Sequence, residues 1–176
     1  MKRIALALAM ASLIASPVGA QQRCITTPEA EAMALVALPD LMRQTGIVCV
    51  GRLPAASSLR NPQSRLIGRY EAEAVRAWPV ARGAIVKLSD PAVDALLDSE
   101  FARPLLTSLL VPLLVGRIAP ADCGTIDRLV SLLEPLPPRN TAGIVVATLQ
   151  YLKAKKAKGD RVSVPDLPLC TAETPL

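Results

Sequence analysis

Residues 104–118 read PLLTSLLVPLLVGRI, the most apolar run in the chain after the first twenty residues. A helix of this composition has no polar face, and such a helix must be buried in a core or a membrane. Arg103 and Arg117 bracket the run, so its uncharged part is far shorter than the roughly 20 residues of a membrane span. A membrane-dipping segment is the alternative. We expect residues 104–118 to lie dry at the centre of a helical globule, kinked near Pro112.

Prolines divide the flanking sequence into short segments. Several follow a residue suited to capping, as in Asp90-Pro91, which is a helix-start signal. The clearest amphipathic pattern covers residues 62–77, with Leu66, Tyr70 and Ala74 on one stripe. Further helices are predicted at residues 28–38, 40–45, 79–88, 91–98, 123–134 and 140–158. The sequence therefore predicts an all-α fold: a compact, disulfide-stabilised bundle of about six or seven short proline-bounded helices.

The first twenty residues have the pattern of a secretory signal peptide. Lys2 and Arg3 precede an apolar stretch over residues 4–14, and a small-residue cleavage motif ends at Ala20. The apolar stretch is too short for an uncleaved anchor, which is the alternative. We expect a periplasmic or secreted protein whose residues 21–176 form one helical domain with an extended C-terminal tail from about residue 160.

Four cysteines occur in the chain, namely Cys24, Cys49, Cys123 and Cys170. An even number in an exported protein predicts two disulfide bonds, and the spacing does not fit zinc. An unbroken helix over residues 27–45 would hold Cys24 and Cys49 too far apart to bond. If Pro39 breaks that helix, the two can meet. We therefore predict sequential pairing, Cys24–Cys49 and Cys123–Cys170, among three possible connectivities.

The composition excludes several chemistries. The 176 residues contain no histidine, which removes the commonest general base and metal ligand. Neither a GxxxxGK[ST] nor a GxGxxG phosphate-binding motif is present. The net charge of +5 includes two charges from residues 1–20, so it is too small to indicate nucleic-acid binding. We assign no catalytic residue, cofactor or metal site.

Charged side chains form three groups on the predicted helices. One group lies off the apolar stripe of residues 62–77 and consists of Arg65, Arg69 and Arg76. These arginines form either a solvated face or a site for an anionic partner. Asp94 and the aspartates four residues before and after it repel one another if they share a helix face. They therefore need solvent, a cation or an arginine, and Arg103 is the nearest candidate. The third group is a run near a helix end that is either solvated or faces an anionic envelope surface: Lys153, Lys155, Lys156 and Lys158.

These observations favour a non-enzymatic binding or accessory protein of the cell envelope. Its expected partner is an envelope protein or an anionic envelope surface, with no nucleic acid and no transmembrane span after cleavage. A small secreted hydrolase using carboxylates or a serine–lysine pair is the first alternative, because such groups need no sequence motif. An apolar-ligand carrier, with residues 104–118 lining a cavity, is the second.

Overall fold

A computed structural model describes residues 24–170, apart from the side chains of Pro91, Ala92, Leu109 and Leu113. The described residues form a compact all-α fold with two disulfides, which confirms the predicted fold class. The predicted signal peptide lies outside the described residues. The elements follow the order α1 (Thr27–Val48), η1 (Ser58–Arg60), α2 (Arg65–Leu88), α3 (Pro91–Leu97), α4 (Ala102–Val115), η2 (Pro120–Asp122), α5 (Cys123–Leu133) and α6 (Pro138–Ala157).

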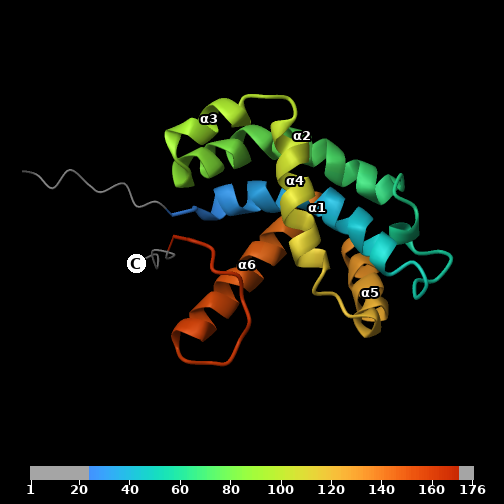
Figure 1. Cartoon of the computed structure of the whole chain (residues 1–176). Coiled ribbons are helices and arrows are strands. Elements are labelled where there is room, and N and C mark those ends of the chain that lie inside the picture. The colour runs from blue at the N-terminus through green and yellow to red at the C-terminus, as the bar shows by residue number, and fades with distance from the viewer. Residues whose placement is uncertain (1–23, 171–176) are drawn as a thin grey trace, which may run out of the picture.

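The central element is α1, against which α2, α4 and α6 all pack (Figure 1). At its start the backbone N–H and hydroxyl of Thr26 both donate to Glu29 Oε2, at 2.8 and 2.9 Å. These bonds satisfy polar groups that the first helical turn leaves free. The predicted break at Pro39 is wrong, because the helix continues through it. Buried residues on both sides of Pro39, such as Val36 and Met42, offset the lost hydrogen bond.

The second long helix, α2, packs along α1 with the predicted stripe. Leu66, Tyr70 and Ala74 are almost completely buried. The predicted end of this helix at residue 77 is wrong, since α2 runs through Pro79 to Leu88. Buried alanines continue the stripe beyond the proline, so packing against α1 extends over the whole helix.

Residues 104–118 do not form the centre of the molecule, so that expectation is wrong. Most of the run belongs to α4, which crosses the outside of α1 (Figure 1). Val111 and Val115 are buried against the core, but Leu105, Leu110 and Leu114 are 59%, 54% and 45% exposed. A helix covered on one side by neighbours keeps its other side in solvent even when its composition is apolar throughout.

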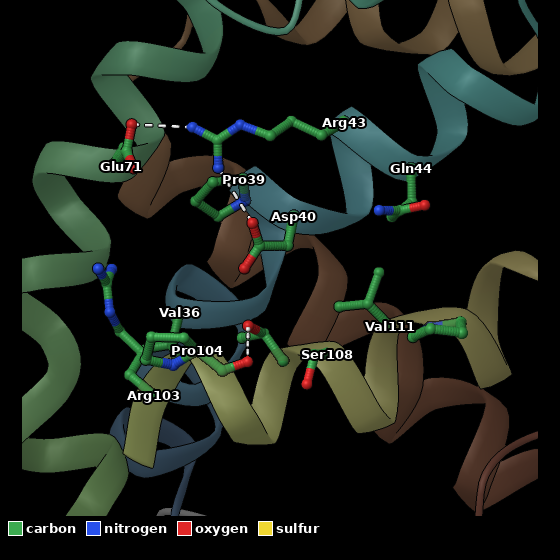
Figure 2. A pocket seen from close by; sticks show the side chains of 12 residues that line it. Val36, Pro39, Asp40, Arg43, Gln44, Glu71, Arg103, Pro104, Ser108 and Val111 are labelled. Carbon is green, nitrogen blue, oxygen red and sulfur yellow. Dashed lines mark hydrogen bonds and ion pairs between the residues drawn. The ribbon is translucent and has the colours of Figure 1, made fainter. Parts of the chain in front are cut away.

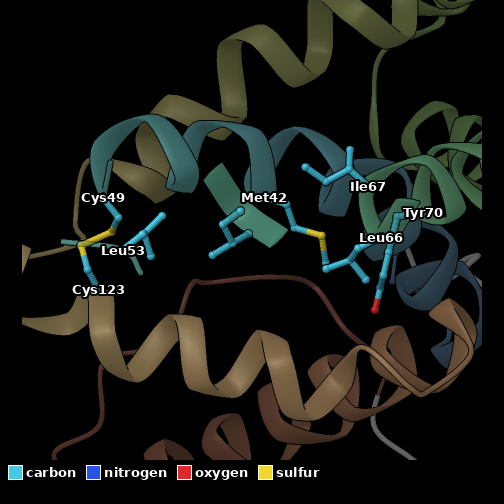
Figure 3. Close-up of a cluster of buried hydrophobic side chains, with 8 residues drawn as sticks. Met42, Cys49, Leu53, Leu66, Ile67, Tyr70 and Cys123 are labelled. Atoms are coloured by element: carbon cyan, nitrogen blue, oxygen red, sulfur yellow. A yellow bond between two sulfur atoms is a disulfide. The ribbon is translucent and has the colours of Figure 1, made fainter. Parts of the chain in front are cut away.

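Both predicted disulfide pairings are wrong. Cys49 at the end of α1 bonds to Cys123 at the start of α5, and Cys24 bonds to Cys170 in the tail. The 22 residues of unbroken α1 separate Cys24 from Cys49 by about 33 Å at 1.5 Å per residue. Cys49 and Cys123 are fully buried in a core cluster with Leu53 (Figure 3).

The C-terminal tail returns from the end of α6 to the start of α1 (Figure 1). Ile25 N–H donates to the carbonyl of Pro168 at 2.7 Å, and Cys170 N–H donates to the carbonyl of Ile25 at 2.9 Å. Ile25 and Leu169 are both buried at this junction. Together with the disulfide, these bonds fix the tail beside the first residues of α1.

A buried hydrogen bond joins α2 to α6 and yields a first prediction. Tyr70 Oη donates to Thr141 Oγ1 at 2.8 Å, and both side chains are buried. Tyr70→Phe removes the donor and leaves a buried hydroxyl without its partner. We expect the free energy of unfolding, measured by urea denaturation, to fall by about 1–3 kcal/mol.

The matched control for this prediction is Tyr151→Phe. Tyr151 lies on α6 and is 61% exposed, so its hydroxyl keeps water as a partner. We expect its removal to change the free energy of unfolding by less than about 0.5 kcal/mol. Equal effects of the two variants would show that the Tyr70–Thr141 bond contributes nothing specific.

Candidate functional site

An apolar groove of about 250 Å³ is lined by α1, α2, α4, α6, Ile25 and the tail. Thr107 is the only residue lining it that has a polar side chain, apart from the indole nitrogen of Trp78. We call this feature the apolar groove. Its lining comprises Ile25, Ala30, Met33, Ala34, Val36, Ala37, Leu38, Leu41, Trp78, Ala81, Ile85, Leu106, Thr107, Leu110, Val111, Leu114, Val145, Val146, Leu149, Leu167 and Leu169.

The groove exists because small side chains of α1 face larger ones on its neighbours. Ala30, Ala34 and Ala37 follow one another at four- and three-residue spacing, so they share one side of α1. Leu110 of α4 and Leu149 of α6 form parts of the opposing walls. Methyl groups on α1 cannot fill the space between these longer side chains, and a hollow remains.

A second, polar pocket of about 410 Å³ lies where α4 meets α1 and α2 (Figure 2). It shares Val36, Thr107 and Val111 with the apolar groove, so the α1–α4 contact separates two hollows. Arg43 in this pocket donates to Asp40 at 3.0 Å and to Glu71 at 2.8 Å. Its charge is thus already matched by carboxylates of the same chain.

Two lysines close to the apolar groove have different partners. Lys87 Nζ lies 2.6 Å from Oε2 of Glu29, which adjoins Ala30 of the groove. The bond from Lys87, with those from Thr26, lowers the pKa of Glu29 below its ordinary value. Lys153 Nζ instead donates to the carbonyl oxygens of Leu167 at 2.8 Å and Leu169 at 3.3 Å.

The predicted arginine face of α2 is partly used within the molecule. Arg69 donates to the carbonyl of Glu134, and Arg76 pairs with Glu73. Arg65 is exposed at the start of the helix. The three arginines share one stripe of α2, but two of them already have protein acceptors.

The predicted lysine run does not form a single surface. Lys153 binds the tail, whereas Lys155 pairs with Asp160 at 3.0 Å. Lys156 and Lys158 are exposed. Lys158 lies beyond the last residue of α6, and the adjacent Lys155 and Lys156 point about 100° apart around the helix.

The aspartates of α3 also have a partner other than the expected one. Arg82 of α2 lies 2.8 Å from Asp94 and 2.5 Å from Asp98, so the expectation that Arg103 neutralises them is wrong. Within residues 24–170 no three cysteine or carboxylate side chains are grouped as metal ligands. None of the acidic side chains described there is buried.

Sequence reasoning missed the residues of the apolar groove. The alanine spacing on α1 was a visible signal, but alanine at helical spacing is equally typical of close helix packing. Leu167 and Leu169 carried no signal, because a tail of this composition shows no amphipathic period. Their role depends on the return of the tail to Ile25, more than 140 positions earlier in the chain.

Comparison with known proteins adds no functional assignment. Within residues 24–170, none of the helices combines the length and apolar character that a membrane crossing requires. No protein-family model, curated protein or solved structure matches this chain.

Proposed function

We propose that this protein is an exported, non-enzymatic binding protein of the cell envelope, and that its ligand is a single unbranched hydrocarbon chain. The apolar groove is the observation that carries the proposal. A ligand buried there meets almost no hydrogen-bonding side chain, so polar atoms on its buried part would lose their water without compensation. A hydrocarbon chain has no such atoms.

The size of the groove supports a slender ligand. Its volume of about 250 Å³ is below the range of about 300–1,000 Å³ typical of sites for drug-sized molecules. The exposed sides of Leu110 and Leu114 border it, so the ligand enters laterally between α4 and α6. A flexible chain fits this opening better than a rigid polycyclic molecule.

Export is the second part of the proposal. Two disulfides in a small protein favour an oxidising compartment, and the pattern of residues 1–20 favours removal by a signal peptidase. N-terminal sequencing of the protein recovered from the producing cell tests this. We expect the chain to begin at Gln21, and recovery of a reduced cytoplasmic protein that begins at Met1 would contradict export.

Binding of straight-chain alcohols to the purified, oxidised protein tests the ligand class. Displacement of an environment-sensitive fluorescent dye gives their dissociation constants. Each methylene that enters the groove contributes about 0.8 kcal/mol, so we expect affinity to rise about fourfold per carbon and then level off when the groove is full.

A pair of alanine variants locates the binding. Ala37→Leu places a larger side chain in the groove, and we expect at least a tenfold loss of alcohol affinity. Ala147→Leu adds the same atoms to an exposed position of α6 outside the groove and leaves affinity unchanged. Equal affinities of the two variants, with both folded by circular dichroism, would contradict binding in the groove.

The exposed apolar side of α3 and α4 favours an envelope protein as a second candidate partner. Leu96, Phe101 and Leu105 are 70%, 77% and 59% exposed. Such side chains are common on surfaces that bind other proteins. Cross-linking in the native envelope tests this: Phe101→Gln abolishes a specific cross-linked product if this surface is used, and an unchanged product would contradict it.

A further inference from the structure

We infer that Lys153 binds the anionic headgroup of the ligand, so that the ligand class is a fatty acid or another single-chain amphiphile with a negative head. The inference rests on the proposed function of the apolar groove and adds the chemistry of the polar end. It assigns to Lys153 a role beyond holding the tail.

Lys153 lies next to residues that line the groove. Leu149, one helical turn earlier on the same side of α6, lines the groove. The two carbonyls that accept bonds from Lys153 belong to Leu167 and Leu169, which also line it. The ammonium is therefore held by the backbone of two residues that line the groove, although Lys153 is not itself part of the lining.

The bonding of Lys153 leaves room for an anion. An ammonium has three N–H donors, and the carbonyls of Leu167 and Leu169 use two of them. Among residues 24–170 no carboxylate lies within ion-pair distance of Lys153: Asp160 pairs with Lys155, and Asp166 forms no ion pair. Lys153 is half-buried and has no counter-ion among the described residues, so it gains from a carboxylate because charge–charge attraction is stronger away from bulk water.

Lys87 provides the internal comparison. It lies near the groove through its partner Glu29, whose carboxylate already matches its charge at 2.6 Å. A ligand carboxylate placed there would meet Glu29 as well as Lys87 and would be repelled. Lys153, with carbonyl partners alone, presents a positive charge that no acid of the described chain cancels.

Three probes with the same ten-carbon chain and different heads test the inference: decanoate, decan-1-ol and decyltrimethylammonium. A charge-assisted hydrogen bond to Lys153 makes decanoate bind about tenfold or more tightly than decan-1-ol. The cationic probe binds more weakly than the alcohol. Equal affinities for acid and alcohol would overturn the inference and leave the proposed function standing, whereas no binding of any probe would contradict the proposed function itself.

Substitution of the lysine separates its headgroup role from its tail contacts. Lys153→Met keeps an apolar stem but has no charge, and we expect the acid-to-alcohol affinity ratio to fall to within about twofold of unity. Any loosening of the tail changes the affinities of both probes and leaves their ratio intact. Lys156→Met, at an exposed position of the same helix, retains the wild-type ratio. A ratio unchanged by Lys153→Met would overturn the inference.

Discussion

Replacing Cys49 and Cys123 together by alanine is expected to lower the free energy of unfolding by about 4 kcal/mol or more. The disulfide joins residues 74 positions apart. Opening a loop of this length stabilises the unfolded chain by about 4 kcal/mol through conformational entropy. Both cysteines are fully buried in the cluster that contains Leu53 and Leu59, so their loss also leaves a cavity. Guanidinium denaturation of the double variant gives the measurement.

The double variant of Cys24 and Cys170 is the matched comparison. Its loop spans 146 positions, and the entropy term alone makes its loss about 0.5 kcal/mol more costly than that of Cys49–Cys123. Cys24 and Cys170 are only half-buried, however, so little packing is lost with them. We expect the buried pair to cost more overall. The opposite order would show that chain entropy outweighs the packing of the buried sulfurs.

The failed disulfide prediction depended on one proline. Helix length correctly excludes a Cys24–Cys49 bond across an unbroken helix, but the sequence predicts that Pro39 breaks this helix. A proline inside a helix costs about 3 kcal/mol, and from the local sequence alone this cost predicts that the helix ends there. In the folded chain Pro39 is itself buried, and α1 buries Leu35 before it and Met42 after it. Packing on both sides of the proline outweighs the local cost.

The position of α4 shows a different limit. Composition predicted a helix over residues 104–118, of which residues 104–115 are helical, and it correctly predicted an all-helical fold. It could not predict how much surface the rest of the chain supplies to cover that helix. Since α4 lies over α1 near Val111, Leu105 and Leu110 remain exposed. Burial depends on neighbours that are distant in sequence.

The apolar groove was the least predictable feature, for the same reason. Each of its walls comes from a different segment, and none carries a motif. The stripe of α2 was predicted because Leu66 and Tyr70 repeat within one helix. Leu149 and Leu167 become neighbours of one cavity only after the tail has returned to α1. Periodicity describes one element at a time, whereas a groove belongs to several.

Replacing Gly46 by alanine is expected to destabilise the protein by about 3 kcal/mol or more, through a contact that only the folded chain reveals. A methyl group on Gly46 would lie 2.0 Å from the carbonyl oxygen of Leu59, which is far inside contact distance. That atom belongs to the backbone of η1, so relief requires movement of the whole connection that buries Leu59 and Leu53. Urea denaturation measures the loss.

Gly68, in the interior of α2, is the control for this prediction, because alanine is expected to stabilise the protein there. Gly68 is exposed, and a methyl group there would meet no atom within 4 Å. Alanine loses less backbone freedom on folding than glycine does, so Gly68→Ala is expected to stabilise the protein by about 0.5–1 kcal/mol. Gly46→Ala gains the same helical advantage, and its net destabilisation therefore measures the clash with Leu59. If both variants stabilised the protein, the close approach of η1 to α1 would be contradicted.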